Sequence, residues 1–329
     1  MKTITVHEAG RVETSEKGEA SALASGQTRI RVKYAGVGFA DVMAVRGGYP
    51  LAPKRPFSPG YEFFGAVEDP GASGLARGQR VAGMIPAMGA YRESIDVESR
   101  YVVPVPPGLG DETAALLPLN YLTAYAMIER CARLESGQSF LIHGAAGGVG
   151  SAALELARLL GLRAYGSAST PKHDLIASLG GVPLHREDHL WKEELERLES
   201  GGVDAAFDAF GVASFRRSWR SLSPGGSLVC YGISPSIDGG NVDFARGLLY
   251  LASRRVFGRG RRVRICGTPA IVRSDPDWYR ASLSKILDWS SRGALVPTLA
   301  EVFPWNRVSD AHRALAAGAV RGKLLLDFS

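Results

Sequence analysis

The sequence predicts an α/β protein in which a doubly wound domain, with helices on both faces of a parallel sheet, is inserted into a second domain rich in β-strands. An apolar run, a glycine-rich turn and an Ala/Leu-rich helical pattern follow one another between residues 140 and 160, whereas residues 1–117 contain short apolar runs separated by Gly and Pro. The length of 329 residues also exceeds that of one ordinary compact core. We therefore expect a doubly wound domain at 118–266 and a second domain at 1–117 plus 267–329.

Composition and charge limit the classes of partner. The formal net charge of +6 arises from 39 Lys and Arg against 33 Asp and Glu, which fits anionic ligands without requiring nucleic acid. The three cysteines, Cys131, Cys230 and Cys266, lack C-x-x-C spacing, so neither a disulfide framework nor a zinc knuckle is expected. The N-terminal segment lacks the apolar region of a signal peptide, and no run reaches membrane-spanning length. These features predict a cytoplasmic protein without a nucleic-acid or membrane partner.

The stretch from Phe140 to Ser151 has the order strand, tight turn and helix. Within the turn, Ala145, Gly147 and Gly150 occupy the small-residue positions of the dinucleotide fingerprint G-x-G-x-x-G. A side chain at Gly147 would hold the backbone away from a pyrophosphate, and one at Gly150 would push the helix off the strand. The phosphates would lie at the helix N-terminus. A purely structural turn is the alternative, whereas a P-loop is disfavoured because Ser151 stands where that motif has Lys.

Other elements follow from apolar periodicity and turn signals. A helical pattern begins at Asp111, a candidate N-cap, while Gly161 is the expected stop signal of the helix after the glycine turn, and Pro224–Gly226 is expected to be a turn. Strands are expected at 30–32, 65–67, 163–166, 203–207, 227–230 and 323–327, and helices at 121–133, 151–160, 191–198, 214–222, 278–290 and 310–317.

Several motifs together resemble one known family. They are residues 37–50 (VGFADVMAVRGGYP), 59–62 (PGYE), 78–81 (GQRV), 122–125 (LTAY), the glycine loop 144–150, and 321–325 (RGKLL). In these motifs the chain is similar to the zinc-free quinone oxidoreductase branch of the medium-chain dehydrogenase/reductases, which also contains enoyl-thioester reductases. The resemblance implies a Rossmann doubly wound parallel sheet domain inserted into a GroES-like β-barrel catalytic domain, a cleft between them, and usually a homodimer.

Zinc-dependent relatives carry a cysteine three residues before the Asp of the first motif and a histidine before the Glu of the second. Gly38 and Tyr61 occupy these positions here, and neither can ligate zinc. Three cysteines are also too few for the four-cysteine structural zinc lobe. We therefore expect no metal.

The choice of cofactor depends on the residues after the second strand. An Asp or Glu there would bond the ribose hydroxyls of NADH, and the segment Gly166–Lys172 contains neither. Lys172 matches the lysine that relatives place on the 2′-phosphate, which favours NADPH, with NADH as the alternative and a solvated lysine as the structural interpretation. The resemblance implies cofactor-binding roles for Thr123, Ala145, Ala146, Gly147, Gly148, Val149, Gly150, Ser167, Lys172, Gly232 and Lys323.

In relatives, NAD(P)H reduces an activated double bond, and the resulting enolate or hydroquinone anion is protonated. Tyr49 corresponds to the tyrosine that some enoyl-thioester reductases use as the acid, and simple packing beside Pro50 is the alternative. Gly38 replaces an Asn common in the family, which counts against the standard quinone activity. Asp41 and Glu62 are expected to serve the fold.

A cluster of six arginines occupies positions 254, 255, 259, 261, 262 and 264. A solvated connection between domains is favoured, and docking of coenzyme A or an acyl-carrier phosphopantetheine is the alternative, because guanidinium groups bind phosphate.

The sequence thus predicts an NAD(P)H-dependent, zinc-independent reductase of an activated C=C bond in a small molecule, with an enoyl thioester or an enone as the expected substrate. A quinone reductase and a non-catalytic NADPH-binding regulator or scaffold are the alternatives. A short-chain dehydrogenase is excluded because no Tyr-x-x-x-Lys occurs.

Overall fold

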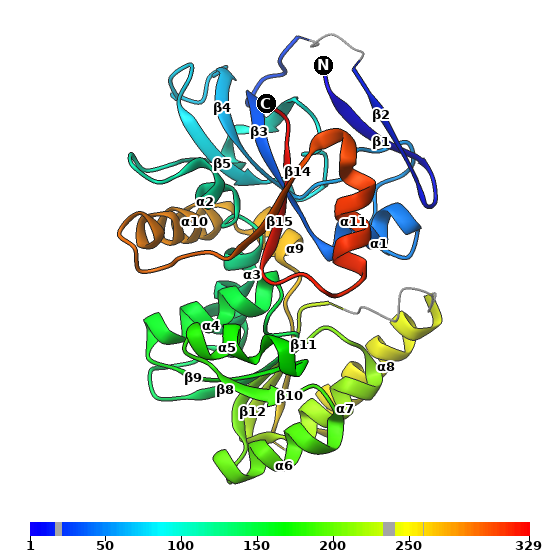
Figure 1. The fold of residues 1–329 in the computed structure, drawn as a ribbon, viewed down its shortest axis with the longest axis vertical. Coiled ribbons are helices and arrows are strands. Elements are labelled where there is room, and N and C mark those ends of the chain that lie inside the picture. The colour runs from blue at the N-terminus through cyan, green and yellow to red at the C-terminus, as the bar shows by residue number, and fades with distance from the viewer. Residues whose placement is uncertain (17–21, 233–240, 259) are drawn as a thin grey trace. The chain divides into compact units, whose positions relative to one another are not determined.

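The computed structural model describes residues 1–16, 22–232, 241–258 and 260–329, and it divides into two compact units (Figure 1). Unit 1 comprises Met1–Leu122 and Pro269–Ser329, and unit 2 comprises Thr123–Thr268. Unit 2 is therefore an insertion into the chain of unit 1. The limits expected for this insertion from the sequence were residues 118 and 266.

Unit 1 is built on a seven-stranded sheet with the order β14-β15-β3-β4-β5-β7, in which β6 also pairs with β3. Only β14 and β15 run parallel to each other among the paired strands described in this sheet. The strands expected at 30–32, 65–67 and 323–327 are confirmed within β3, β4 and β15. The strands are β3 (Gln27–Val37), β4 (Glu62–Asp69), β5 (Arg80–Met84), β6 (Ser94–Glu98), β7 (Val102–Pro104), β14 (Leu299–Pro304) and β15 (Lys323–Asp327), while β1 (Thr3–Glu8) and β2 (Arg11–Ser15) form a separate antiparallel pair.

In the described part of the chain, six α-helices and two short 3₁₀ segments belong to unit 1 or start at its boundary with unit 2. The expected N-cap at Asp111 is wrong by one residue, because Gly110 caps the helix and Asp111 is its first residue. The Asp111 carboxylate instead pairs with Lys33 Nζ (2.9 Å) and Arg80 Nη2 (2.7 Å). The helical elements are α1 (Phe39–Arg46), η1 (Ser99–Tyr101), α2 (Asp111–Ala115), α3 (Asn120–Tyr125), α9 (Thr268–Ser274), α10 (Pro276–Ser291), η4 (Trp305–Arg307) and α11 (Val308–Ala316).

Unit 2 contains a six-stranded parallel sheet with the order β10-β9-β8-β11-β12-β13. The first strand in the sequence, β8, lies in the middle, and the chain completes one side before it crosses to the other. This order is the doubly wound arrangement that the sequence predicted. The strands are β8 (Ser139–His143), β9 (Arg163–Ala168), β10 (Val182–His185), β11 (Val203–Asp208), β12 (Leu222–Cys230) and β13 (Arg262–Ile265).

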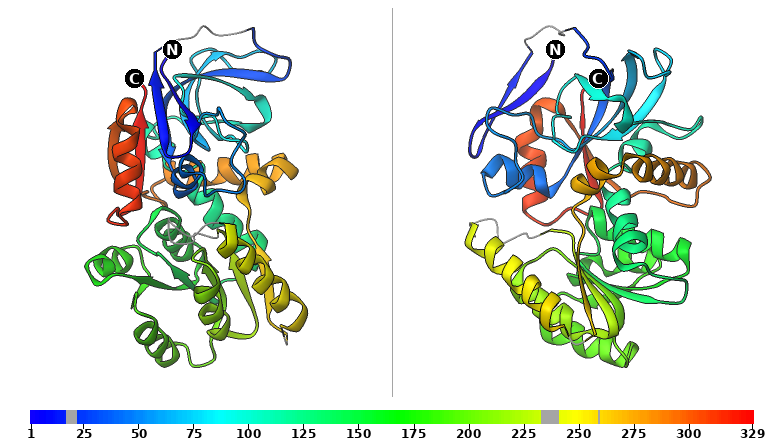
Figure 2. Two further views of the ribbon diagram at one scale, coloured as in Figure 1. Left: turned by 90° about the vertical axis from the view of Figure 1, so that its right-hand side faces the viewer. Right: turned by 180° about the vertical axis from the view of Figure 1, so that it is seen from behind.

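Helices lie on both faces of this sheet (Figure 2). One face carries a core to which α6, α7 and α8 contribute Trp191, Phe215 and Leu251. The expected end of α4 is confirmed, since Gly161 closes the helix with a φ of 70°. The helical elements are the π-helical η2 (Ala126–Ala132), α4 (Gly148–Leu160), η3 (Thr170–Lys172), α5 (His173–Ser178), α6 (Asp188–Leu198), α7 (Val212–Arg220) and α8 (Asn241–Phe257).

Pro224–Gly226 does not form the expected turn between elements. These residues lie inside β12, where the register jumps from the Val203–Leu222 pair to the Ala205–Ser227 pair. The extra residues form a bulge in which Gly225 has a φ of 84°. A bulge and a hairpin turn use the same residue types, so the sequence pattern does not separate them.

The arginine cluster does not connect the two units. Its residues lie within unit 2, between the C-terminal end of α8 and β13. Arg254 lies over the ring of Tyr250 at 5.2 Å, and Arg261 donates to the Trp219 carbonyl at 3.0 Å. These two side chains therefore stabilise unit 2. Arg259 lies outside the described residues, and phosphate docking by the cluster stays a prediction.

Candidate functional site

The glycine turn joins β8 to α4, and it brings six predicted residues together, namely Ala145, Ala146, Gly147, Gly148, Val149 and Gly150. A Cβ at Gly150 would lie 2.5 Å from the Gly144 carbonyl oxygen, so only glycine fits there. A Cβ at Gly147, the N-cap of α4, would lie 3.3 Å from the same oxygen, which a small shift relieves. The packing of unit 2 itself therefore requires Gly150, whereas it does not strictly require Gly147.

The turn is also held against β9. The amides of Gly144 and Ala145 both donate to the Ser167 carbonyl, at 3.1 and 3.2 Å. A Cβ at Gly166 would lie 2.6 Å from the Ala145 Cβ, so β9 needs a glycine where it contacts the turn. The turn thus lies at the carboxyl end of β8, beside the position where the strand order reverses between β8 and β11. In doubly wound sheets, ligands bind at that position.

A buried polar network that was not expected from the sequence lies at the carboxyl ends of β8 and β11. His143, the last residue of β8, has Nδ1 2.7 Å from the Ser167 hydroxyl and Nε2 3.0 Å from the Ser218 hydroxyl. Asp208, the last residue of β11, accepts hydrogen bonds from Ser214 and Ser218, both at 2.6 Å. The Ser167 hydroxyl, predicted to bind the cofactor, thus faces His143. The strand expected at 203–207 stops one residue before Asp208, so the sequence did not mark Asp208 as part of a network.

The other predicted cofactor residues of unit 2 lie at three separate places. The Thr123 hydroxyl is 2.9 Å from the Thr268 hydroxyl, and both residues are buried. Lys172 ends η3, the short segment that follows β9. Gly232 follows β12, and its carbonyl accepts a hydrogen bond from Cys230 Sγ at 3.1 Å. Lys172 and Gly232 thus follow the carboxyl ends of β9 and β12, as residues of a ligand site in a parallel sheet do.

The candidate acid, Tyr49, lies in unit 1 and is half-buried. The Tyr61 hydroxyl donates a hydrogen bond to the Tyr49 hydroxyl at 3.1 Å, and the two rings meet edge to face. Burial raises the pKa of Tyr49, and the hydrogen bond from Tyr61 lowers it. Tyr49 therefore stays protonated at neutral pH. Because its oxygen is the acceptor in this pair, its own proton can be donated to another group.

Asp41 is fully buried beside this pair of tyrosines. Its carboxylate accepts hydrogen bonds from the amides of Gly38 (2.8 Å) and Gly60 (3.0 Å) and from the Tyr91 hydroxyl (3.3 Å). Burial raises the pKa of Asp41 to about 6. These contacts tie α1 to the segment before β4, so the carboxylate orders the loop that carries Tyr49.

Lys323 and Glu62 form a buried ion pair between β15 and β4. Lys323 is 4% exposed and Glu62 is 0% exposed. Glu62 Oε2 also accepts a hydrogen bond from the Leu119 amide at 2.8 Å. Burial raises the pKa of Glu62, and the Lys323 charge lowers it. The side chain of Lys323 thus holds the fold of unit 1, and its role toward a cofactor stays a prediction.

The two positions that hold zinc ligands in zinc-dependent relatives contain Gly38 at the N-cap of α1 and the buried Tyr61. Within the described ranges, no group of three or more His, Cys, Asp and Glu side chains could hold a metal ion. In the same residues, no helix has the length and hydropathy to cross a bilayer.

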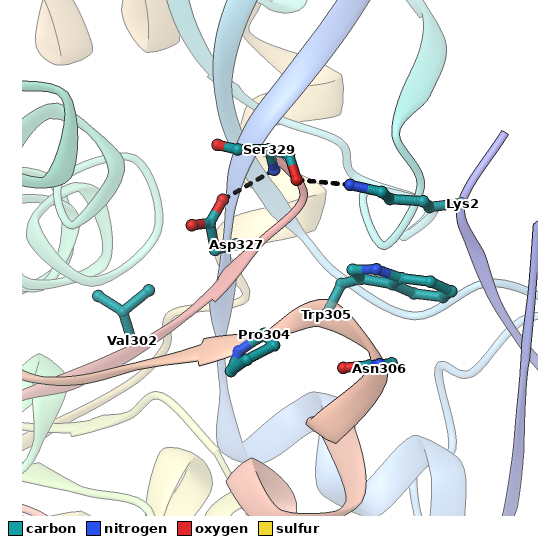
Figure 3. A pocket seen from close by; sticks show the side chains of 7 residues that line it. All are labelled: Lys2, Val302, Pro304, Trp305, Asn306, Asp327 and Ser329. Atoms are coloured by element: carbon teal, nitrogen blue, oxygen red, sulfur yellow. Dashed lines mark hydrogen bonds between the residues drawn. The ribbon is translucent and has the colours of Figure 1, made fainter.

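A surface cavity of about 360 Å³ in unit 1 contains none of the predicted site residues (Figure 3). Its walls come from β14, from η4, from the end of β15 with the following Ser329, and from Lys2 near the N-terminus. The Lys2 ammonium donates to the Ser329 carbonyl at 2.5 Å and to the Phe328 carbonyl at 2.9 Å. These bonds hold the two terminal segments together, and they bring no candidate acid or cofactor residue to the cavity.

Two family models match the chain. An alcohol dehydrogenase GroES-like domain matches residues 24–107, and a zinc-binding dehydrogenase model matches residues 184–326. The chain is 30% identical to the rat synaptic vesicle membrane protein VAT-1 homolog over 92% of its own length and 76% of that protein. It is 31% identical to the zebrafish VAT-1 homolog, over 93% of this chain and 65% of that protein.

Other relatives are larger enzymes or solved structures. The chain is 30% identical to the reducing polyketide synthase rdc5 of Metacordyceps chlamydosporia, over 93% of this chain but 13% of that protein. Escherichia coli quinone oxidoreductase complexed with NADPH matches with a TM-score of 0.87 and 23% identity, over 99% of this chain and all of that one. The CurK enoyl reductase matches with a TM-score of 0.85 and 23% identity, over 99% and 98% of the two chains.

Proposed function

The chain belongs to the medium-chain dehydrogenase/reductase family, in its zinc-free branch, and from this premise we propose that it is an NADPH-dependent reductase of activated carbon–carbon double bonds. The proposed substrate is an α,β-unsaturated carbonyl compound, and an enoyl thioester on coenzyme A or on an acyl carrier is favoured. The reducing polyketide synthase and the enoyl reductase among its relatives support this substrate class. The hydrogen-bonded pair of Tyr49 and Tyr61 is the observation that carries the proposal.

The glycine turn of unit 2 supports a dinucleotide as the cofactor. The N-terminus of α4 offers free amides to a pyrophosphate, and Gly147 leaves the approach to these amides open. The segment after β9 contains Lys172 and no carboxylate before it, which supports NADPH over NADH. The Escherichia coli quinone oxidoreductase structure contains NADPH as well. When bound, the reduced nicotinamide would supply a hydride to the β-carbon of the substrate.

Tyr49 is the proposed proton donor. Its hydroxyl would donate a hydrogen bond to the substrate carbonyl oxygen, which stabilises the negative charge of the enolate, and would then transfer its proton. Tyr61 would act through Tyr49, because its hydrogen bond stabilises the phenolate that remains after this transfer. Tyr61 is 3% exposed, so water competes little for this bond.

The activity test follows the oxidation of NADPH with a panel of enoyl-CoA esters, enones and quinones. Tyr49→Phe should lower kcat on enoyl thioesters by about 100-fold or more, because a general acid contributes that much. The control is Tyr34→Phe, which removes a phenol oxygen from β3 of the same unit and should leave kcat unchanged. Unchanged turnover by Tyr49→Phe would remove the acid role from this residue, and a failure of NADPH to bind would remove the function itself.

A quinone reductase is the second candidate, since the chain shares its fold with Escherichia coli quinone oxidoreductase. This candidate predicts turnover with quinones that Tyr49→Phe leaves intact, and little turnover with enoyl thioesters. NADPH binding without oxidation by any substrate of the panel would instead support a regulator or scaffold.

A homodimer is proposed from the edge of the sheet in unit 2. Among the described strands, β13 pairs only with β12, so one edge of β13 is open. Ile265 in this strand and Val256 and Phe257 at the end of α8 are 61%, 72% and 73% exposed. An apolar surface beside an open strand edge favours pairing with a second copy.

Light scattering measures the molar mass of the protein in solution and should give twice the mass of one chain. The variant Phe257→Glu should lower this molar mass to that of one chain. A wild-type monomer would contradict the proposal.

A further inference from the structure

Four buried residues link three strands of unit 2 near their carboxyl ends. They are Asp208 at the end of β11, Ser218 in α7, His143 at the end of β8 and Ser167 in β9, and we call them the His143 network. Each of the four is at most 7% exposed. The strands β8 and β11 are neighbours at the point where the strand order reverses, and ligands of doubly wound sheets bind at that point. The network therefore lies next to the expected cofactor site.

The hydrogen bonds of the His143 network all run in one direction. The Ser218 hydroxyl donates its single proton to Asp208 at 2.6 Å, so its oxygen is the acceptor from His143 Nε2 at 3.0 Å. Nε2 therefore carries the proton of the neutral imidazole, and Nδ1 accepts a hydrogen bond from the Ser167 hydroxyl at 2.7 Å. The proton of Ser167 is thus donated to His143 rather than to a cofactor phosphate.

Ser167 also holds the glycine turn through its backbone. Its carbonyl accepts hydrogen bonds from both the Gly144 and the Ala145 amides, at 3.1 and 3.2 Å. His143 directly precedes Gly144 in the sequence, and the Gly144 carbonyl accepts from the amide of Gly147, the N-cap of α4, at 3.0 Å. The His143 network is thus joined to the turn at two points, and a rotation of Ser167 or His143 would move the turn.

We propose that Asp208 and His143 position the glycine turn for the pyrophosphate of the cofactor, and that they act through Ser167. Apolar side chains could join the three strands at a lower desolvation cost than a buried carboxylate and imidazole do. A directed series of hydrogen bonds instead fixes the orientation of each member, and with it the Ser167 carbonyl that holds the turn. His143 and Asp208 are thus positioning residues. This inference rests on the proposed binding of a dinucleotide.

The test measures the Kd values of NADPH and NADH by fluorescence titration of the full chain. Ser218→Ala breaks the link between His143 and Asp208. It should raise both Kd values by the same factor, about tenfold, because both cofactors contain the pyrophosphate.

The matched control is Ser214→Ala. It removes a hydrogen bond of the same length to Asp208 from the same helix, and it leaves the link between Ser218 and His143 in place. Both Kd values should stay at those of the wild type. Equal losses of affinity in Ser214→Ala and Ser218→Ala, or no loss in Ser218→Ala, would overturn the proposal.

Ser167→Ala tests the other end of the network and keeps the carbonyl that holds the turn. It should also raise the Kd values of NADPH and NADH by a common factor, because Ser167 acts on the turn. Unchanged Kd values, or a loss of affinity for NADPH alone through a direct bond to its 2′-phosphate, would overturn the positioning role. Circular dichroism establishes that each variant is folded, and if Ser218→Ala does not fold, Ser167→Ala is decisive.

A measurement without cofactor separates this inference from the proposed function. In nitrogen-15 NMR spectra at pH 7, the His143 ring should show a protonated Nε2 and an unprotonated Nδ1. Ser218→Ala should shift the Nε2 resonance, whereas Ser214→Ala should not. A proton on Nδ1 would overturn the direction of the hydrogen bonds. A wild type that shows the expected ring protonation and binds neither cofactor would instead overturn the proposed function.

Discussion

The two units form their candidate sites by different means. In unit 2 the turn between β8 and α4 consists of backbone and small side chains, and a Cβ at Gly150 has no room. In unit 1 the candidate residues are side chains, namely the Tyr49–Tyr61 pair, and the buried Asp41 carboxylate lies close to both. A site made of backbone groups can be recognised from a short sequence motif, because its glycines are close together in the chain. A side-chain site depends on contacts between distant segments, so it is recognised only when those segments are placed.

Breaking the buried ion pair should have the largest effect on stability. Lys323→Met leaves the Glu62 carboxylate buried without its partner and should lower the free energy of unfolding by about 4 kcal/mol. Urea denaturation measures this change. Asp288→Asn, which breaks the exposed Arg292–Asp288 pair, is the control and should cost less than about 1 kcal/mol. If the double variant Glu62→Leu/Lys323→Met were no more stable than Lys323→Met, the unpaired charge would not be the cause.

His312 in α11 should make the stability of unit 1 depend on pH. Burial, with a contribution from Arg46, lowers the pKa of His312 from 6.5 to about 4. Above pH 6.5 the His312 ring is neutral in both the folded and the unfolded protein, and its full contribution to stability is present. As the pH falls from 6.5 through 4 this contribution is lost, which lowers the free energy of unfolding by about 3 kcal/mol. Asp41, with a pKa raised to about 6, acts in the opposite direction.

The free energy of unfolding at pH 7 and pH 4 measures this contribution. The difference between the two values should be smaller by about 3 kcal/mol in His312→Leu than in the wild type. Equal differences in the two proteins would contradict the assignment. The exposed His7 provides the control, since His7→Leu should leave the difference unchanged.

Two glycines of the turn should respond differently to alanine. Gly150→Ala forces a Cβ against the Gly144 oxygen and should destabilise unit 2 by about 2 kcal/mol. Gly147→Ala should fold as the wild type does, yet its NADPH affinity should fall about tenfold, or about 1.4 kcal/mol, because the new methyl group obstructs the amides of α4. Thermal unfolding and fluorescence titration measure the two effects. An equal loss of stability in both variants would remove the distinction between packing and ligand access.

Tyr61→Phe should have a smaller effect than Tyr49→Phe, since it removes a supporting hydrogen bond rather than the proton donor. We expect kcat on enoyl thioesters to fall about tenfold. Without the bond from Tyr61 the pKa of Tyr49 rises, so the basic limb of the kcat–pH profile should move to higher pH. A lower kcat with an unmoved basic limb would indicate that Tyr61 only packs against Tyr49.

The fold class and the position of the glycine turn were predictable because their signals are local. Strand β8, the glycines and the stop at Gly161 follow one another within a short segment. The bulge at Pro224–Gly226 was predicted as a turn because glycine and proline serve both structures. The His143–Asp208 network and the Tyr49–Tyr61 pair were not predictable, since each requires knowledge of which strand ends or loops lie side by side.

The order of the strands in unit 1 has a consequence for synthesis on the ribosome. The strand β3 pairs with β15, which is encoded after the whole of unit 2. A nascent chain therefore leaves Tyr34–Val37 of β3 without this partner until unit 2 has emerged, whereas Gln27–Arg31 can already pair with β6. Such an unpaired strand is prone to aggregation, so chaperones should engage the N-terminal segment during elongation rather than the inserted one.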